Sequence, residues 1–169
     1  MASIIKVDTI QTAAGGTPTA ADLGINTTGN VLQVVEGSTY TITTTTGTTF
    51  VDSNIEATIT PNFTSSKILI FASTTAAKSA HNTYLAFRFT RNGTSLGYLG
   101  DLLQYTNDTS WCATQATFTQ IDSPSSTSAL TYKLQFANEG GSGTAYTQVD
   151  SSGGMERGRG QIILMEIAG

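Results

Sequence analysis

The alternation of apolar and polar positions from residue 31 onward predicts a succession of β-strands. In Ala129–Ala137, for example, apolar side chains occupy every second position and polar side chains occupy the positions between them. A period of two places these two sets on opposite faces of a strand. The strands predicted in this way are Val31–Glu36, Thr39–Thr46, Thr48–Ile59, Lys67–Ala77, Tyr84–Arg91, Ser95–Leu99, Ser110–Asp122, Ala129–Ala137, Thr144–Val149 and Gln161–Ile167.

Turn signals separate these runs. Asn92-Gly93 is a strong hairpin signal, because this pair favours the turn whose twist matches two paired strands. Gly37-Ser38 is expected to end the first strand, and Asp101–Asp108 is expected to be a loop. Many short strands without a helical period predict an all-β fold, a jelly-roll-type antiparallel β-sandwich.

The first thirty residues follow a different pattern. They contain one short apolar run, Ile4–Ile10, and one predicted helical turn, Thr17–Gly24, which together cannot bury much surface. We therefore expect a short N-terminal attachment arm over residues 1–30 and a sandwich over residues 31–169. The arm's candidate contacts with other proteins are Ile4, Val7, Ile10 and Leu23.

The last run, Gln161–Ile167, is too apolar for an exposed sheet edge, which would invite uncontrolled pairing with other chains. Two positions are open to it: the centre of a sheet, or a contact with a neighbouring subunit. Ile162 and Leu164 are accordingly candidates for an oligomer core.

Composition supports the strands and excludes some partners. The chain has 31 threonines in 169 residues, and threonine is β-branched and suits a half-exposed strand. The net charge of -4 with only 8 Lys and Arg argues against nucleic acid, because phosphate binding needs clustered basic side chains. The N-terminal sequence has no long apolar stretch, so neither a signal peptide nor membrane insertion is expected.

The sequence offers little catalytic chemistry. It has one cysteine, Cys112, and one histidine, His81, so a disulfide within the chain is excluded and a zinc site is not expected. No nucleotide-binding or hydrolase motif occurs, and no cofactor is expected. The alternative is a glycosidase, which needs two facing carboxyl groups. Asp101, Asp108, Asp122 and Asp150 flank strand ends, where acidic residues more often cap turns. The prediction is a non-enzymatic protein.

A binding function has more candidates. Tyr98, Tyr105 and Trp111 surround a polar loop and could stack on sugar rings, or could belong to a core or interface. His81 lies in a polar loop, where it is either simply exposed or a receptor contact. Arg157 and Arg159 form the one basic cluster, for a phosphate or acidic sugar, or for a salt bridge.

Several short motifs resemble virion structural proteins of marine bacteriophages, often described as tail-fibre proteins. They span nearly the whole chain, with least similarity over Asp101–Ser128. The motifs are Ser3–Gln11, the Gly-Gly-Thr-Pro stretch, Gly29–Val35, Ala57–Pro61, Thr64–Ile70, Arg91–Thr94 and Ile163–Ile167.

The resemblance implies a jelly-roll knob behind an attachment segment, like the trimeric heads of the tumour-necrosis-factor superfamily. It implies a homotrimer, with Gln161–Ile167 near the three-fold axis, and contacts with other virion proteins through the arm. It implies a tail fibre or spike in the virion, made in the host cytoplasm, that binds a host surface glycan or protein. The chain lacks a repetitive shaft, so a capsid decoration or head-fibre protein on the outside of the head is the alternative.

Overall fold

Ten β-strands form the described part of the chain, which comprises residues 11, 15–17, 28–105, 107, 111–140, 142–150 and 158–169 of a computed structural model. No helix occurs among these residues, and hence none that could cross a membrane. The strands are β1 (Val31–Thr39), β2 (Thr43–Thr45), β3 (Val51–Ile59), β4 (Lys67–Lys78), β5 (Leu85–Arg91), β6 (Thr94–Leu103), β7 (Cys112–Asp122), β8 (Leu130–Asn138), β9 (Ala145–Thr147) and β10 (Gly160–Ile167).

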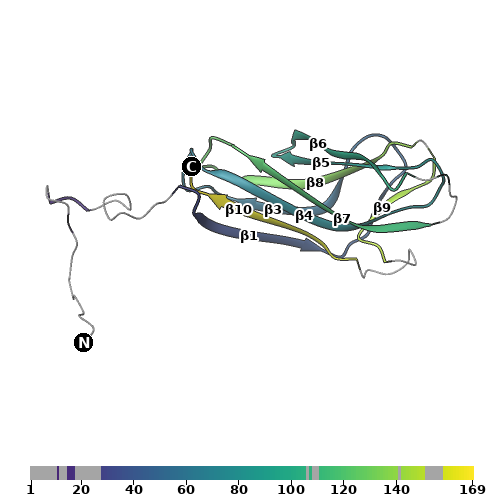
Figure 1. The fold of residues 1–169 in the computed structure, drawn as a ribbon, viewed down its shortest axis with the longest axis horizontal. Helices are drawn as coiled ribbons and strands as arrows, with labels where there is room; N and C mark the ends of the chain where they lie inside the picture. The colour runs from purple at the N-terminus through teal and green to yellow at the C-terminus, as the bar shows by residue number, and fades with distance from the viewer. Residues whose placement is uncertain are drawn as a thin grey trace, which may run out of the picture.

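The strands form two stacked antiparallel sheets (Figure 1). One sheet has six strands. Four of them, β1, β10, β4 and β7, lie side by side in this order. The short strand β9 pairs with the last residues of β4, and β2 pairs with β9. The other sheet has four strands in the order β3, β8, β5, β6. All pairs within the sheets are antiparallel.

The pairing is that of a jelly roll. The first strand pairs with the last, β3 pairs with β8, β4 with β7, and β5 with β6. The chain is thus one long hairpin of nested pairs, which rolls up into two four-stranded layers with β2 and β9 as additions. Asn92 and Gly93 form the innermost turn, and both have positive φ (49° and 82°) as the hairpin signal predicts. The predicted fold class is confirmed.

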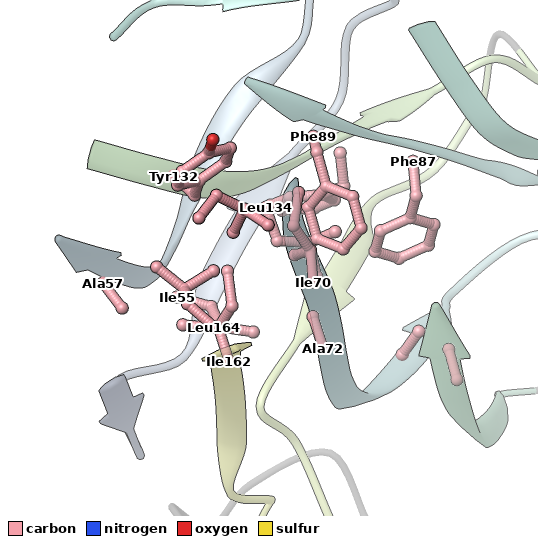
Figure 2. Close-up of a cluster of buried hydrophobic side chains, with 14 of the residues drawn as sticks. Ile55, Ala57, Ile70, Ala72, Phe87, Phe89, Tyr132, Leu134, Ile162 and Leu164 are labelled. Carbon is pink, nitrogen blue, oxygen red and sulfur yellow. The ribbon is translucent and has the colours of Figure 1, made fainter. Parts of the chain in front are cut away.

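The core lies between the sheets and consists of the inward-facing half of each alternating strand. Figure 2 shows side chains of both sheets meeting in this layer, among them Ile70 and Leu164 from one sheet and Phe89 and Leu134 from the other. Phe87 packs against Phe118 and Phe136, with ring centroids 4.6 and 6.2 Å away. Period-two alternation therefore decides which residues hold the sandwich together.

The terminal strand β10 is central in its sheet, between β1 and β4, which is one of the two positions that its apolar sequence left open. Ile162 and Leu164, however, are completely buried in the subunit's own core (Figure 2), so they are not placed to contact another copy. Because side chains alternate, Ile163 and Met165 on the same strand point to the opposite, outer face and remain partly exposed.

Some predicted boundaries differ from the structure. The first strand continues through Gly37 to Thr39, and only Thr43–Thr45 of the next predicted strand is a strand. The predicted loop from Asp101 begins inside β6, which runs to Leu103. The arm's candidate contacts, Ile4, Val7, Ile10 and Leu23, lie outside the described residues. The backbone N–H of Gly29 donates to the oxygen of Ala168, and the N–H of Ala168 donates to the oxygen of Asn30. β1 therefore begins beside Ala168.

At Gly37, inside β1, the two sheets come so close together that only glycine fits. A Cβ atom at this position would lie 1.8 Å from the backbone oxygen of Glu56 in β3. A backbone oxygen cannot rotate away as a side chain can, so β1 would have to move. We expect Gly37→Ala to lower the free energy of unfolding by about 2–3 kcal/mol, as overpacking does.

Urea unfolding of Gly37→Ala and Gly100→Ala measures this effect. Gly100 is also a strand glycine, in β6, but a Cβ there would meet no atom within 4 Å. Gly100→Ala should therefore be neutral or slightly stabilising. Equal midpoints for Gly37→Ala and the wild type would show that β1 does not approach β3 this closely.

Candidate functional site

The outer face of the four-stranded sheet carries an exposed aromatic group. Phe50 immediately precedes β3, and Tyr98 lies in β6, at the opposite edge of the same sheet. Their ring centroids are 5.2 Å apart with an edge-on geometry of 79°. The guanidinium carbon of Arg88 lies 4.2 Å from the centre of the Phe50 ring. These contacts fix Phe50 and leave Tyr98 64% exposed.

A chain of polar contacts leads from the aromatic group across the sheet. Arg88 Nε donates to Gln135 Oε1 (2.8 Å), and Gln135 Nε2 donates to Asp52 Oδ1 (2.6 Å). Lys133 Nζ then joins Asp52 and Glu56, each at 2.9 Å. The register produces this order, because Gln135 pairs with both Arg88 and Asp52, and Lys133 pairs with Glu56.

Opposite charges along this series of polar contacts stabilise one another. Burial alone would raise the pKa of Asp52, but the hydrogen bonds from Gln135 and Lys133 and the lysine charge outweigh it and hold that pKa below its ordinary value. The hydrogen bonds to Asp52 and Glu56 raise the pKa of Lys133. Asp52 and Lys133 therefore stay ionised at neutral pH, and the surface offers fixed donors and acceptors.

These side chains line an open groove of about 510 Å³. Its lining residues come from three strands and the β5–β6 turn: Asp52, Glu56, Thr90, Asn92, Gly93, Thr131, Lys133 and Gln135. The turn is fixed in place, because Asn92 exchanges two 2.8 Å hydrogen bonds with the backbone of Thr131. Thr90, one of the lining residues, is buried, and its hydroxyl has no hydrogen-bond partner among the described residues.

The arrangement suits binding. Asp52 and Glu56 are both held by the same lysine, so neither is set apart as a proton donor. Of the strand-end aspartates, Asp122 accepts hydrogen bonds from Arg91 (2.6 Å) and from Tyr132 (2.7 Å), which ties β7 to the other sheet. Within the described ranges, no three His, Cys, Asp or Glu side chains are grouped as a metal site requires.

The structure distributes the predicted contact residues over three places. Tyr98 alone belongs to the aromatic group above. Tyr105 packs edge-on against Tyr84 (5.9 Å), and Trp111 packs against Tyr146 (4.9 Å), both near the end of the sandwich where His81 is exposed in the β4–β5 connection.

The two predicted arginines have different outcomes. Arg159 forms an ion pair with Glu36 of β1, which is one of the two alternatives open to it, a salt bridge. Arg157 lies outside the described residues.

Sequence reasoning missed Phe50, Arg88, Asp52, Lys133 and Gln135. A signal was available for part of this set: Lys133 and Gln135 occupy the polar positions of the clearest alternating strand, and so face solvent. The pairing of β8 with β3 and β5, which brings the others beside them, is not visible in the sequence.

Comparisons with known proteins give only structural similarities. Neither protein-family models nor curated protein sequences match the chain. A mutant VP2 protein of infectious bursal disease virus in T=1 particles is similar with a TM-score of 0.45 and 11% identity, over 82% of this chain and 37% of that one. The T13 particle of the same virus gives a TM-score of 0.46 and 11% identity, over 83% and 36%. The chain thus spans little more than a third of these proteins' length.

Proposed function

We propose that this chain is a non-enzymatic attachment protein of a virus particle, which binds a host surface glycan on the outer face of its four-stranded sheet. The observation that supports this best is the position of Tyr98. Its ring is 64% exposed beside Phe50 and Arg88, and the polar groove begins at Gln135, the hydrogen-bond partner of Arg88.

The chemistry of this face matches a sugar. The C–H groups on one side of a pyranose ring pack on the electron-rich face of an aromatic ring such as that of Tyr98. The hydroxyl groups of the sugar need both donors and acceptors, which Lys133, Gln135 and Asp52 provide at fixed positions. A large apolar ligand would find few contacts in a groove lined by charged and amide side chains.

The particle role is supported by sequence and topology together. The motifs that resemble virion proteins of marine bacteriophages include Arg91–Thr94, which forms the innermost turn of the jelly roll and one end of the groove. The tail fibre or spike remains the preferred location. The alternative location, on the outside of the head as a decoration or head-fibre protein, is compatible with the same binding face.

Tyr98→Ala is expected to weaken binding to host cells and to their purified surface polysaccharide about tenfold. The reason is that one well-placed aromatic contact contributes about 1–2 kcal/mol, and a factor of ten corresponds to about 1.4 kcal/mol. Binding of labelled protein to cells, and glycan-array or calorimetric titration of the polysaccharide, measure the loss.

Tyr40→Ala is the matched control, because Tyr40 is also an exposed tyrosine but lies in the β1–β2 connection. It should bind like the wild type. Equal binding by Tyr98→Ala and the wild type would reject this face as the receptor site. Release of reducing sugar by the wild-type protein would reject the non-enzymatic assignment.

Immunogold labelling of intact particles tests the location separately. Label on the tail or its fibres would support the preferred role in attachment. Label spread over the head would favour the decoration protein.

A further inference from the structure

The outer face of the six-stranded sheet is the opposite of the glycan-binding face in character. The strands β1, β10, β4 and β7 are neighbours in this sheet (Figure 1). One row of apolar side chains crosses all four of them. Val34 pairs with Met165, Met165 with Leu69, and Leu69 with Ile121. Val34 and Ile121, at the two ends of the row, are 57% and 58% exposed. We call these four residues the apolar row.

Apolar side chains continue on both sides of the apolar row. On one side, Ile163 of β10 pairs with Phe71 of β4, and Phe71 is 39% exposed. On the other side, Val31 pairs with Ile167. A shallow hollow of about 100 Å³, large enough for a side chain from outside, lies beside Phe71 and Ile163.

The size of this face matches a small protein interface. Four strands about 4.8 Å apart, each contributing about eight residues at about 3.3 Å, cover roughly 500 Å². The apolar row and its apolar neighbours occupy the middle of this area, and exposed apolar patches of a few hundred Å² commonly mark binding sites. The whole face is smaller than the roughly 800 Å² that each partner contributes to a standard protein interface and is in the range of smaller, weaker interfaces.

The distribution of charge favours a second copy of the chain as the partner. The centre of the face is uncharged, so identical faces do not repel each other. Its margin carries both signs, with Lys67 at one end and the Glu36–Arg159 ion pair towards the other. Too few cations are present for an anionic membrane or nucleic acid.

We propose that copies of this chain associate through the outer face of the six-stranded sheet, with the apolar row at the centre of the contact. Met165 and Leu69 then form the contact between copies. The sequence had suggested Ile162 and Leu164 for this role. It leaves the Tyr98 face, on the other sheet, open to solvent in each copy. Several such faces on one oligomer would bind a repetitive glycan with greater avidity than a single copy.

Sedimentation of the full chain and of the double variant Val34→Lys/Ile121→Lys tests the proposal. The wild type is expected to sediment as an oligomer of the 17.7 kDa chain, above the mass of one copy at all but the lowest concentrations. The double variant is expected to sediment as a 17.7 kDa monomer with an unchanged circular dichroism spectrum. Both positions are more than half exposed in the subunit, so lysine is tolerated there when the copies separate.

Tyr98→Ala separates this result from the proposed function, because it should lose glycan binding and keep the oligomeric mass. The double variant should instead lose the mass and keep the affinity of a single site for glycan. A wild type that is monomeric over the whole concentration range would overturn the proposal. So would a double variant that folds and retains the wild-type mass. If lysine prevents folding, Val34→Ser/Ile121→Ser should still shift the equilibrium towards the monomer.

Discussion

Replacing Leu164 with aspartate is expected to remove much of the stability of the fold. Leu164 is completely buried in the core between the sheets, at the middle of the central strand β10. A carboxylate there would be surrounded by apolar side chains, which costs about 4 kcal/mol or more. A domain of this size is stable by only about 5–15 kcal/mol, so this one change removes much of its stability. Circular dichroism and urea unfolding, at one fixed protein concentration, measure the effect.

Two further variants make the result interpretable. Leu164→Ala should fold but lose about 3–4 kcal/mol, because it removes buried methyl groups and leaves a cavity. Met165→Asp places the same charge one residue further along β10, on the outer face, and should keep the subunit folded while weakening its association. If Leu164→Asp unfolded at the wild-type urea midpoint, the placement of Leu164 in the core would be wrong.

Replacing Glu166 with alanine is expected to lower the free energy of unfolding by about 3 kcal/mol, because the buried hydroxyl of Ser66 and three partly buried donor groups would lose a charged acceptor. The carboxylate of Glu166 is buried at the end of β10 and accepts four hydrogen bonds. The donors are Gln33 Nε2 at 2.6 Å, the backbone N and Nδ2 of Asn62 at 2.7 and 2.8 Å, and Ser66 Oγ at 2.7 Å. Glu166 thus joins β1, the β3–β4 connection and β10.

Glu36→Ala is the matched control. Glu36 is also a strand glutamate with a charged partner, Arg159, but both side chains are nearly half exposed. An exposed ion pair contributes about 0–1 kcal/mol, so this variant should unfold close to the wild type. Similar losses for the two glutamates would argue that Glu166 is not the buried acceptor described above.

The pH dependence of stability gives a second readout for Glu166. Burial raises the pKa of this carboxyl, but its hydrogen bonds outweigh that effect and hold the pKa below the ordinary value of 4.5. The unfolded chain therefore binds the proton at higher pH than the folded chain does. The stability that Glu166 contributes is complete above about pH 4.5 and is lost as the pH falls through the lower, folded-state pKa.

We therefore expect wild-type stability to fall on acidification below this point, and the fall to be smaller in Glu166→Ala. Asp52, whose pKa is also lowered, contributes in the same direction and remains in both proteins. Urea midpoints measured from neutral pH down to acid give the two curves. Parallel curves would mean that Glu166 is not ionised and hydrogen-bonded in the folded state.

The sequence by itself determined the fold class and most of the strands. Alternation with a period of two is a local property, so β8 and its inward-facing side chains could be predicted directly. The Asn92-Gly93 turn is local in the same way, because two adjacent residues set its geometry. The apolar character of Gln161–Ile167 was sufficient to exclude an exposed sheet edge for β10.

Only the tertiary structure decided which of these strands are neighbours. Gly37 was expected to end a strand, but β1 continues through it. The residue there is glycine because the backbone of Glu56, from the other sheet, leaves no room for a side chain. The groove depends on the pairing of β3, β8 and β5, and Asp52 and Gln135 are 83 residues apart in the chain. Such contacts form by long-range strand pairing, which leaves no mark in the local sequence of either partner.

The roles of single residues divide in the same way. The sequence identified Tyr98 as an aromatic candidate, but Phe50 and Arg88 became part of the same surface only through folding. For β10, the apolar pattern was clear, whereas the choice between Leu164 and Met165 as the outward residue needed the second sheet to be in place. Alternation specifies two faces of a strand, and the packing of one sheet on the other decides which face is the core.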